Sequence, residues 1–386
     1  MKDLIPLKIM YVYYHMAYTG GVVRVLSDKM NYLSEHGYEI TLVTYEQGEH
    51  PLIFALNPNI HYYDTQTPLF PLYKYHYFTR LYHLYRINRV FTLRLKSIID
   101  KTKPNIIITV AGDHMSCNAV AKINSDAKKI IESHSINFET MNGVKKGKNN
   151  ILQKLYEIFD KRTISNFDAL VALTQGSAKE WRNIIPLVFV IPNPITQYPE
   201  NIPEPTIHKR IIAVGRLDFE KGFDRLVTAF SLISEEIQDW KLDIYGEGKE
   251  KEKLLSLIQS NTLADKIEIH QPTSDIYNEY MRSDFCVVSS YYEGWGLVLV
   301  EAMSCGIPCV SFNCKYGPQD IIKDKENGLL AINNDINDLS KKMLWMCQHQ
   351  EERIQMGQKA REDMNHYKKD IIMHKWEQLF RNITEQ

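Results

Sequence analysis

Residues 8–45 read KIMYVYYHMAYTGGVVRVLSDKMNYLSEHGYEITLVTY, and this stretch predicts the first unit of the fold. It opens with an apolar run rich in tyrosine and valine, which is typical of a buried strand. After a turn at Gly20 and Gly21, apolar residues recur at three- and four-residue steps, the period of a helix. Residues 38–45 then form a second apolar strand. Strand, helix and strand in this order predict a βαβ unit.

The same alternation continues along the chain in two series. Further strands are predicted at 105–110, 129–132, 169–173, 210–214, 240–245, 266–270, 285–289 and 308–312. Five prolines between positions 192 and 205 separate the two series and indicate an extended linker. We therefore expect an α/β fold with two Rossmann-like domains that face each other across a cleft. The expected parts are an N-terminal domain (1–191), a linker (192–207), a C-terminal domain (208–365) and a C-terminal helix (366–386) that packs back on the N-terminal domain.

Composition and charge exclude several classes of protein. Of 386 residues, 44% are hydrophobic and 24% charged, which excludes an intrinsically disordered chain. The net charge of −1 excludes a wholly basic nucleic-acid coat, and we expect no nucleic-acid partner. The six cysteines include no CxxC pair, so neither a disulfide framework nor a zinc site is expected. No signal peptide or membrane span is recognised, and we expect a soluble protein of the reducing cytoplasm.

The strongest functional signal is the loop and helix start EGWGLVLVEAM, residues 293–303, directly after a predicted strand. Gly294 and Gly296 leave room for a ligand beside backbone amides, and a helix N-terminus attracts phosphate. Glu293 and Glu301 would repel an anion, but they accept strong hydrogen bonds from hydroxyl groups. Phosphate plus polyol describes a sugar nucleotide. By itself, the loop fits equally well an ordinary helix start with two solvated glutamates.

A second signal is GRLDFEKG, residues 215–222, again between a strand and a helix. Arg216 and Lys221 lie where two cations could face one pyrophosphate. The segment matches neither a Walker motif nor GxGxxG. No GxGxxG follows the first strand of the chain either, which disfavours a Rossmann dehydrogenase. Taken alone, the simpler interpretation is that both cations pair with acidic neighbours, namely Asp218, Glu220 or Asp224.

Together, the two loops resemble the C-terminal domain of the retaining glycosyltransferases of family 4, which have the GT-B fold. The matching segments, all within 208–332, are VGRLDFEKGFDRLV, IYGEGKEKEKL, SSYYEGWGLVLVEAMSCGIPCVSF and GPQDIIKDKENGLL. Glu293 and Glu301, eight positions apart, match the paired-glutamate motif of that family. TGGVVRVLSDKMNYLSEHGYEITLVT resembles its first βαβ unit, and VIPNPI its interdomain strand.

The resemblance implies a role for each matching residue. Arg216 and Lys221 would bind the donor's diphosphate and stabilise the charge that grows on it. Glu301 would accept hydrogen bonds from the ribose, and Glu293 from the transferred sugar. His134 would lie near that sugar. The implied nucleotide-sugar contacts are completed by Gly20, Gly21, Gly215, Gly246, Gly294, Gly296, Leu297 and Val298.

The resemblance also implies the chemistry. A sugar would pass from a nucleotide-sugar donor to a glycan or polyprenyl-linked acceptor, with retention of anomeric configuration, in surface polysaccharide or glycolipid synthesis. UDP-sugars are the favoured donors and GDP-mannose is the alternative. No metal or other cofactor is expected, because no DxD is placed to hold one. Val22 and Val23 depart from the small residue and acid of many members, which puts the acceptor side in doubt.

Other functions remain open. A GT-B epimerase or phosphorylase is one alternative, although a phosphorylase would need a cofactor lysine and usually a longer chain. A non-catalytic relative that only binds nucleotide sugars is another. Such a relative would be expected to lack one of the charged positions, and all four are present: Arg216, Lys221, Glu293 and Glu301.

Residues 65–99 form a separate feature, with six lysines and arginines, no acidic residue and many interleaved aromatics. This composition suits an anionic lipid headgroup region, so we expect peripheral attachment to the inner membrane leaflet. A solvated basic helix whose aromatics belong to the core is an equally weighted interpretation. A nucleic-acid surface is a poorer third.

Overall fold

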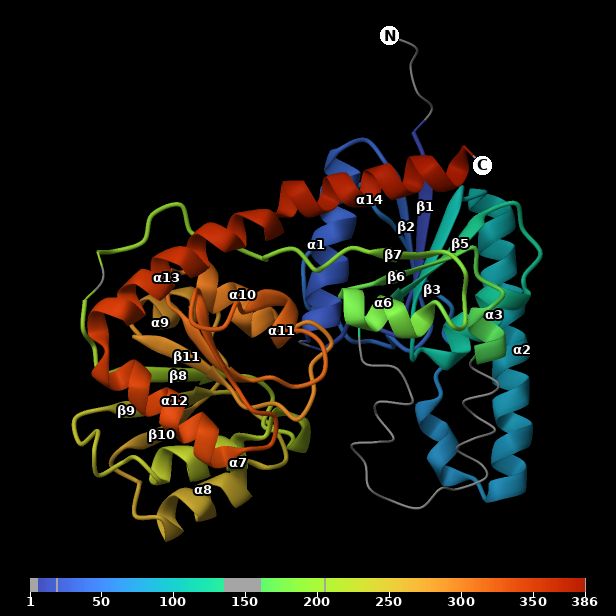
Figure 1. The fold of residues 1–386 in the computed structure, drawn as a ribbon. Helices are drawn as coiled ribbons and strands as arrows, with labels where there is room; N and C mark the ends of the chain where they lie inside the picture. Colours follow the sequence, from blue (N-terminus) through green and yellow to red (C-terminus); the bar gives the residue numbers. More distant parts are fainter. Residues whose placement is uncertain (1–5, 19, 135–160, 205, 386) are drawn as a thin grey trace. The chain divides into compact units, whose positions relative to one another are not determined.

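The computed structural model describes residues 6–18, 20–134, 161–204 and 206–385, which form two compact units (Figure 1). The first unit contains Met1–Pro192 together with Met373–Gln386, and the second contains Asn193–Ile372. The proline-rich stretch after position 192 and the start of the last helix are thus grouped with the second unit.

The first unit is built on a parallel sheet with the strand order β3-β2-β1-β4-β5-β6-β7. Its strands are β1 (Lys8–Val12), β2 (Glu39–Thr44), β3 (His61–Asp64), β4 (Ile106–Val110), β5 (Lys128–Ser133), β6 (Ala169–Ala172) and β7 (Val188–Val190). In the centre, Ile9 of β1 pairs with Ile40 on one side and Ile106 on the other. β4 and β6 are buried along their whole length, as expected where helices cover both faces of a parallel sheet.

The helices of this unit are α1 (Gly21–Glu35), η1 (Phe70–Lys74), α2 (Tyr77–Thr102), α3 (His114–Lys122), α6 (Gln175–Trp181) and most of α14 (Lys369–Thr384). The N-terminal βαβ unit is formed by β1, α1 and β2, as the sequence predicts. From the last helix, Trp376 and Phe380 are buried, and the Phe380 ring lies 6.3 Å from the ring of Tyr38.

The second unit repeats the architecture with the strand order β10-β9-β8-β11-β12-β13. Its strands are β8 (Arg210–Val214), β9 (Lys241–Tyr245), β10 (Ile267–His270), β11 (Phe285–Val288), β12 (Cys309–Phe312) and β13 (Gly328–Ala331). Its helices are η2 (Phe219–Lys221), α7 (Phe223–Ser231), α8 (Lys251–Ser260), α9 (Ile276–Met281), α10 (Leu297–Ser304), α11 (Pro318–Ile321), α12 (Ile336–Gln348), α13 (Gln350–Met364) and η3 (Asn365–Tyr367). Phe230, Phe285 and Phe312 are fully buried between sheet and helices.

The predicted α/β fold with two Rossmann-like domains is confirmed. In each unit, parallel strands end at a common edge, and the loops that follow them carry the predicted site residues. All six cysteines are free thiols. Among the described residues, no helix combines the length and apolar character needed to cross a membrane.

Candidate functional site

In the second unit, the loop between β8 and α7 carries the first predicted cation. The Arg216 guanidinium contacts Asp218 at 2.9 Å and Glu220 at 3.5 Å. These are two of the acidic neighbours that the simpler sequence interpretation named. The Arg216 side chain is nevertheless 62% exposed, so the ion pairs leave much of the guanidinium open to a ligand. Exposed pairs of this kind are weak and are easily exchanged for a phosphate.

Lys221 pairs differently from that interpretation. Its Nζ lies 2.6 Å from Oε1 of Glu293, in the other predicted loop. The Ser290 hydroxyl donates to the same oxygen at 2.6 Å. The structure therefore brings together the second cation and the first of the paired glutamates, which lie 72 positions apart in the sequence.

Backbone contacts hold the two loops against each other. The Tyr291 amide donates to the carbonyl oxygen of Glu220 at 2.9 Å, and the Ser289 hydroxyl donates to that of Lys221 at 3.0 Å. Gly222 has φ +61°, and a Cβ there would lie 2.4 Å from the Ser289 carbonyl oxygen. Only glycine allows this approach.

Gly246, predicted to contact the nucleotide, has a packing role in this structure. A Cβ at this position would lie 1.9 Å from the carbonyl oxygen of Gly215. Glycine at position 246 therefore lets the end of β9 approach that of β8 closely. A contact from either glycine to a nucleotide remains a prediction.

The paired glutamates lie on either side of the start of α10. Gly296 is the N-cap residue with φ +99°, and Leu297 and Val298 form the first turn, where backbone N–H groups have no partner within the helix. Gly294 lies in the preceding loop and is partly exposed. Glu301 is also partly exposed, and its Oε2 accepts a hydrogen bond of 3.3 Å from the buried Tyr280 hydroxyl. The site thus offers amides, two cations and two carboxylates on adjacent loops.

In the first unit, Gly20 is the N-cap residue of α1, and Gly21 is the exposed first residue of that helix. Gly20 has φ −176° and ψ 150°, an extended conformation that any residue adopts. Apart from its chain neighbours, no atom of the described residues lies within 4 Å of the position that a Cβ would take. Among the described residues, neither strain nor packing therefore requires glycine at position 20.

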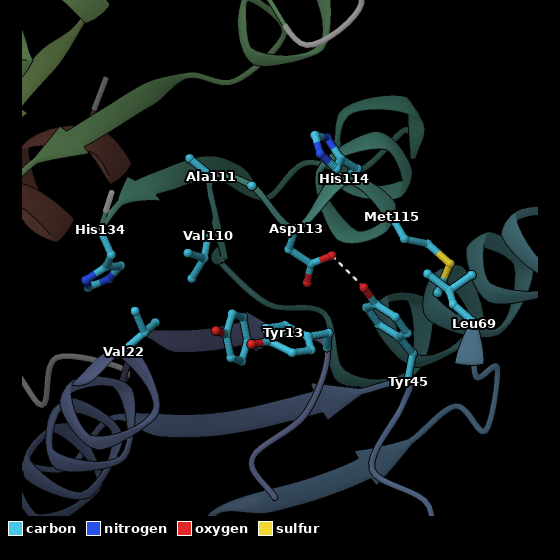
Figure 2. Close-up of a pocket in the computed structure, with 12 residues that line it drawn as sticks. Tyr13, Val22, Tyr45, Leu69, Val110, Ala111, Asp113, His114, Met115 and His134 are labelled. Carbon is cyan, nitrogen blue, oxygen red and sulfur yellow. Dashed lines mark hydrogen bonds between the residues drawn. The ribbon is translucent and has the colours of Figure 1, made fainter. Parts of the chain in front are cut away.

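Beside this helix start, the first unit contains a cavity of about 430 Å³ (Figure 2). Its wall is rich in tyrosine and apolar side chains: Tyr13, Tyr14, Val22, Tyr45, Leu69, Val110, Ala111, Gly112, Asp113, His114, Met115 and His134. A few polar groups in an apolar wall are characteristic of small-molecule sites. Val22, the departure from the family pattern noted above, is part of this wall.

Asp113 is the buried acid of the cavity. It accepts hydrogen bonds from the Tyr45 hydroxyl at 2.7 Å and from the Ser116 hydroxyl at 2.7 Å, and it caps α3 (Figure 2). Burial raises the pKa of Asp113, although both hydroxyls act against that shift. The sequence reasoning missed this residue. The signal was a polar AGDH stretch directly after the β4 strand, the position where ligand-binding residues of parallel sheets lie.

His134, at the end of β5, lines the same cavity. Its Nε2 lies 2.9 Å from Oε2 of Glu132, whose Oε1 lies 2.6 Å from Nζ of Lys29. Sequence reasoning singled out His134 but neither of its partners, because Lys29 and Glu132 are 103 positions apart.

Metal-ligand side chains gather in one place within the described residues, namely Asp243, Glu268 and His270 on β9 and β10. Asp243 is already paired with the guanidinium of Arg210 and lies 2.8 Å from Nε2 of His270. A cation there would have to displace or face that guanidinium, so the donor set fits a metal poorly.

Comparison with known proteins gives consistent matches over most of the chain. Residues 19–197 match the model of "Glycosyltransferase Family 4", and residues 195–363 match that of "Glycosyl transferases group 1". The chain is 27% identical to an uncharacterised glycosyltransferase of Haemophilus influenzae, covering 96% of this chain and 98% of that one. It is 25% identical to the amylovoran biosynthesis glycosyltransferase AmsD of Erwinia amylovora, covering 94% and 96%.

Solved structures share the fold. A variant of Staphylococcus aureus TarM, solved with fondaparinux, α-GlcNAc-glycerol and UDP, superimposes with a TM-score of 0.77 at 17% identity. The match covers 97% of this chain and 99% of that one.

Proposed function

The chain is a GT-B glycosyltransferase of the family 4 type, and from this premise we propose that it transfers a sugar from a UDP-sugar to a glycan or lipid-linked acceptor with retention of configuration. The observation that carries the proposal is the contact between Lys221 and Glu293. In the proposed complex, Lys221 binds the diphosphate and the adjacent Glu293 accepts hydrogen bonds from the sugar hydroxyls, a combination that suits a nucleotide-sugar donor.

In the proposed reaction, the bond between the anomeric carbon and the diphosphate oxygen breaks while the acceptor oxygen bonds to the same face of that carbon. The leaving phosphate oxygen takes the acceptor's proton, so no side chain needs to act as the base. Arg216, Lys221 and the N-terminus of α10 stabilise the charge that grows on the diphosphate. This set of positive groups makes a divalent metal unnecessary.

The other residues hold the donor. Glu301 accepts hydrogen bonds from the ribose, far from the reacting bond, and Glu293 orients the transferred sugar. The amides of Leu297 and Val298 lie at the phosphate and sugar, and the N-terminus of α1 at Gly20 approaches the diphosphate. The TarM complex contains UDP and α-GlcNAc-glycerol, which supports a UDP-sugar as the donor. The AmsD match supports a role in surface polysaccharide synthesis.

A surface of α2 suits a lipid-linked acceptor. Phe91, Leu95 and Ile99 bury one side of this helix, while Leu81, Tyr82, Tyr85 and Leu93 are exposed, Tyr85 to 65%. Exposed arginines at positions 80, 86 and 89 share the helix with them. The exposed tyrosines disagree with the interpretation that the aromatics belong to the core. We include in the proposal that this surface rests on an anionic membrane.

The membrane contact is tested by co-sedimentation with anionic and neutral vesicles. Wild type should bind anionic vesicles at low salt, and a variant with Arg80, Arg86 and Arg89 changed to Glu should not. Equal binding of both proteins would exclude the α2 surface from any membrane contact.

The donor is tested with a panel of UDP- and GDP-sugars, measuring nucleotide release and thermal stabilisation. A donor at about 100 times its dissociation constant should stabilise the protein by about 2.7 kcal/mol. UDP release from at least one UDP-sugar is expected, and NMR of the product should show retained configuration. Release of GDP alone would favour the mannosyltransferase alternative. Binding without release in the presence of lipid-linked acceptors would favour a non-catalytic relative.

A further inference from the structure

A row of buried charged side chains ends at the wall of the cavity in the first unit. Lys29 of α1 and Glu132 of β5 form an ion pair of 2.6 Å, with side chains only 1% and 3% exposed. The second carboxylate oxygen of Glu132 lies 2.9 Å from Nε2 of His134. The ring of Trp376, from α14, covers the Lys29 ammonium at 3.4 Å from the ring centroid. Figure 2 shows His134 at one end of the cavity, with Val22 beside it.

The ionisation of Glu132 decides which hydrogen bond it makes. Burial alone raises the pKa of this carboxyl, but Lys29 and His134 outweigh it, and the pKa lies below its ordinary value. An ionised carboxylate can only accept hydrogen bonds. The proton between Glu132 and His134 therefore belongs to Nε2 of the imidazole.

The charge of Lys29 decides whether His134 carries a second proton. A carboxylate alone beside a buried histidine favours the imidazolium form. Here Lys29 already balances the single negative charge, and a protonated His134 would leave one uncompensated positive charge in a buried site. Tyr11 of β1 also lies near the pair, and burial keeps it neutral by raising its pKa. Across the cavity lie Asp113 and His114.

The second nitrogen of the ring, Nδ1, takes no part in the contact with Glu132. Nδ1 of His134 is buried and has no hydrogen-bond partner among the described residues. A neutral imidazole protonated at Nε2 presents a lone pair at Nδ1. Sugar hydroxyls are the donors that such a lone pair accepts.

We propose that Lys29 and Glu132 are positioning residues that hold His134 neutral and protonated at Nε2, so that Nδ1 accepts a hydrogen bond from a substrate hydroxyl. Glu132 sets the tautomer of His134, and Lys29 prevents a second protonation of His134 by neutralising the charge of Glu132. The Trp376 ring covers the Lys29–Glu132 ion pair, so the C-terminal helix α14 contributes to this arrangement. The identity of the hydroxyl-bearing substrate rests on the function proposed above, whereas the protonation state of His134 does not.

The state of His134 is measured by NMR of protein labelled with ¹⁵N at histidine. The His134→Gln variant identifies the resonances of His134 among the 13 histidines. In wild type at pH 7, the two nitrogens should show the pattern of a neutral ring protonated at Nε2. A ring protonated at Nδ1 alone, or at both nitrogens, would overturn the proposal.

The Lys29→Met variant tests the role of the charge. With Glu132 left uncompensated, His134 should become protonated at both nitrogens at pH 7. If this variant does not fold, the Lys29→Met, Glu132→Gln double variant removes both charges and leaves an amide oxygen to accept from Nε2. His134 should then be neutral again, with the wild-type tautomer. A neutral ring in Lys29→Met, or a Nδ1-protonated ring in the double variant, would refute the assigned roles.

Arg353→Met is the matched control. Arg353 and Asp284 form an equally buried pair of 2.9 Å, in the other unit. Its loss should destabilise the protein without changing the resonances of His134. A change there would mean that the NMR signature reports general destabilisation.

Activity separates this inference from the proposed function. Lys29→Met should bind UDP as wild type does but turn over roughly tenfold or more slowly, because a protonated ring donates from Nδ1 and no longer accepts the hydrogen bond of the substrate hydroxyl. Equal turnover would remove the functional part of the inference. If no sugar nucleotide is a substrate of wild type, the proposed function fails, and the NMR result still decides the state of His134.

Discussion

Replacing Gly20 by alanine separates a ligand contact from a structural requirement. The φ of −176° suits any residue, and among the described residues no atom beyond the chain neighbours lies within 4 Å of the new methyl group. Alanine is a poorer N-cap than glycine by up to about 1 kcal/mol, and the lost freedom of the unfolded chain offsets about 0.4–1 kcal/mol of this. The free energy of unfolding should therefore change by less than about 1 kcal/mol, or at most about 4 °C in melting temperature.

Turnover should respond quite differently. In the proposed complex the diphosphate approaches the backbone at Gly20, and a methyl group there displaces it by about 1 Å. A misplacement of this size costs about 100-fold in rate. The assay is nucleotide release by the Gly20→Ala variant at saturating donor, beside a thermal melt of the same sample.

Gly20→Ser sharpens the test, because serine is a favoured N-cap and also carries a Cβ. It should be at least as stable as Gly20→Ala and equally impaired in turnover. If both variants are as active as wild type, the diphosphate does not approach α1. If both lose activity only in proportion to a loss of folded protein, glycine has a structural role that the reasoning missed.

Three further predictions concern charged residues. Glu301→Ala should weaken donor binding and Glu293→Ala should mainly lower turnover, each by about 1.5–3 kcal/mol. Steady-state kinetics at limiting and saturating donor measure both effects, and equal behaviour of both variants and wild type would contradict the assignment. Arg216→Ala and Lys221→Ala should be folded but nearly inactive. Wild type should keep its activity in EDTA. Complete loss of activity in EDTA, with recovery when magnesium is added, would contradict the metal-independent reaction. Glu132→Gln should lower the free energy of unfolding by about 3–5 kcal/mol at pH 7 in urea denaturation. The pKa of Glu132 is lower in the folded protein than its value near 4.5 in the unfolded chain, so this carboxylate stabilises the fold at pH values above 4.5. That stability is lost as the pH falls through the folded-state pKa. The difference in unfolding free energy between wild type and Glu132→Gln should therefore shrink in acid.

Local patterns made the fold predictable. The β1, α1, β2 unit follows from hydrophobic periods and a glycine turn within one stretch of sequence, and the second series of strands follows from the same signal. Short strands with weak patterns, such as β3 with the exposed His61 and Tyr62, were not predicted. Their place depends on pairing with β2, which is a tertiary contact.

The site was predictable in its residue types but not in its pairings. Lys221 has acidic neighbours in its own loop, and the simpler of the two sequence interpretations paired it with those. The contact with Glu293 exists because β8 and β11 are adjacent in the sheet, which brings the two loops to one edge. The Lys29–Glu132 pair was missed for a similar reason, because the tertiary fold brings α1 and β5 together over a long sequence distance. Asp113, in contrast, had a local signal in the polar stretch after β4.

Titration calorimetry with UDP tests most directly whether the two loops of the second unit bind the nucleotide. The account predicts that wild type binds UDP and that the Arg216→Ala, Glu301→Ala double variant binds it at least about 100-fold more weakly, since two charged hydrogen-bonding groups are lost. Arg282→Ala, which removes a similarly exposed arginine of the same unit that is ion-paired with Glu279, should bind UDP like wild type. Equal affinity of the double variant and wild type would contradict the account.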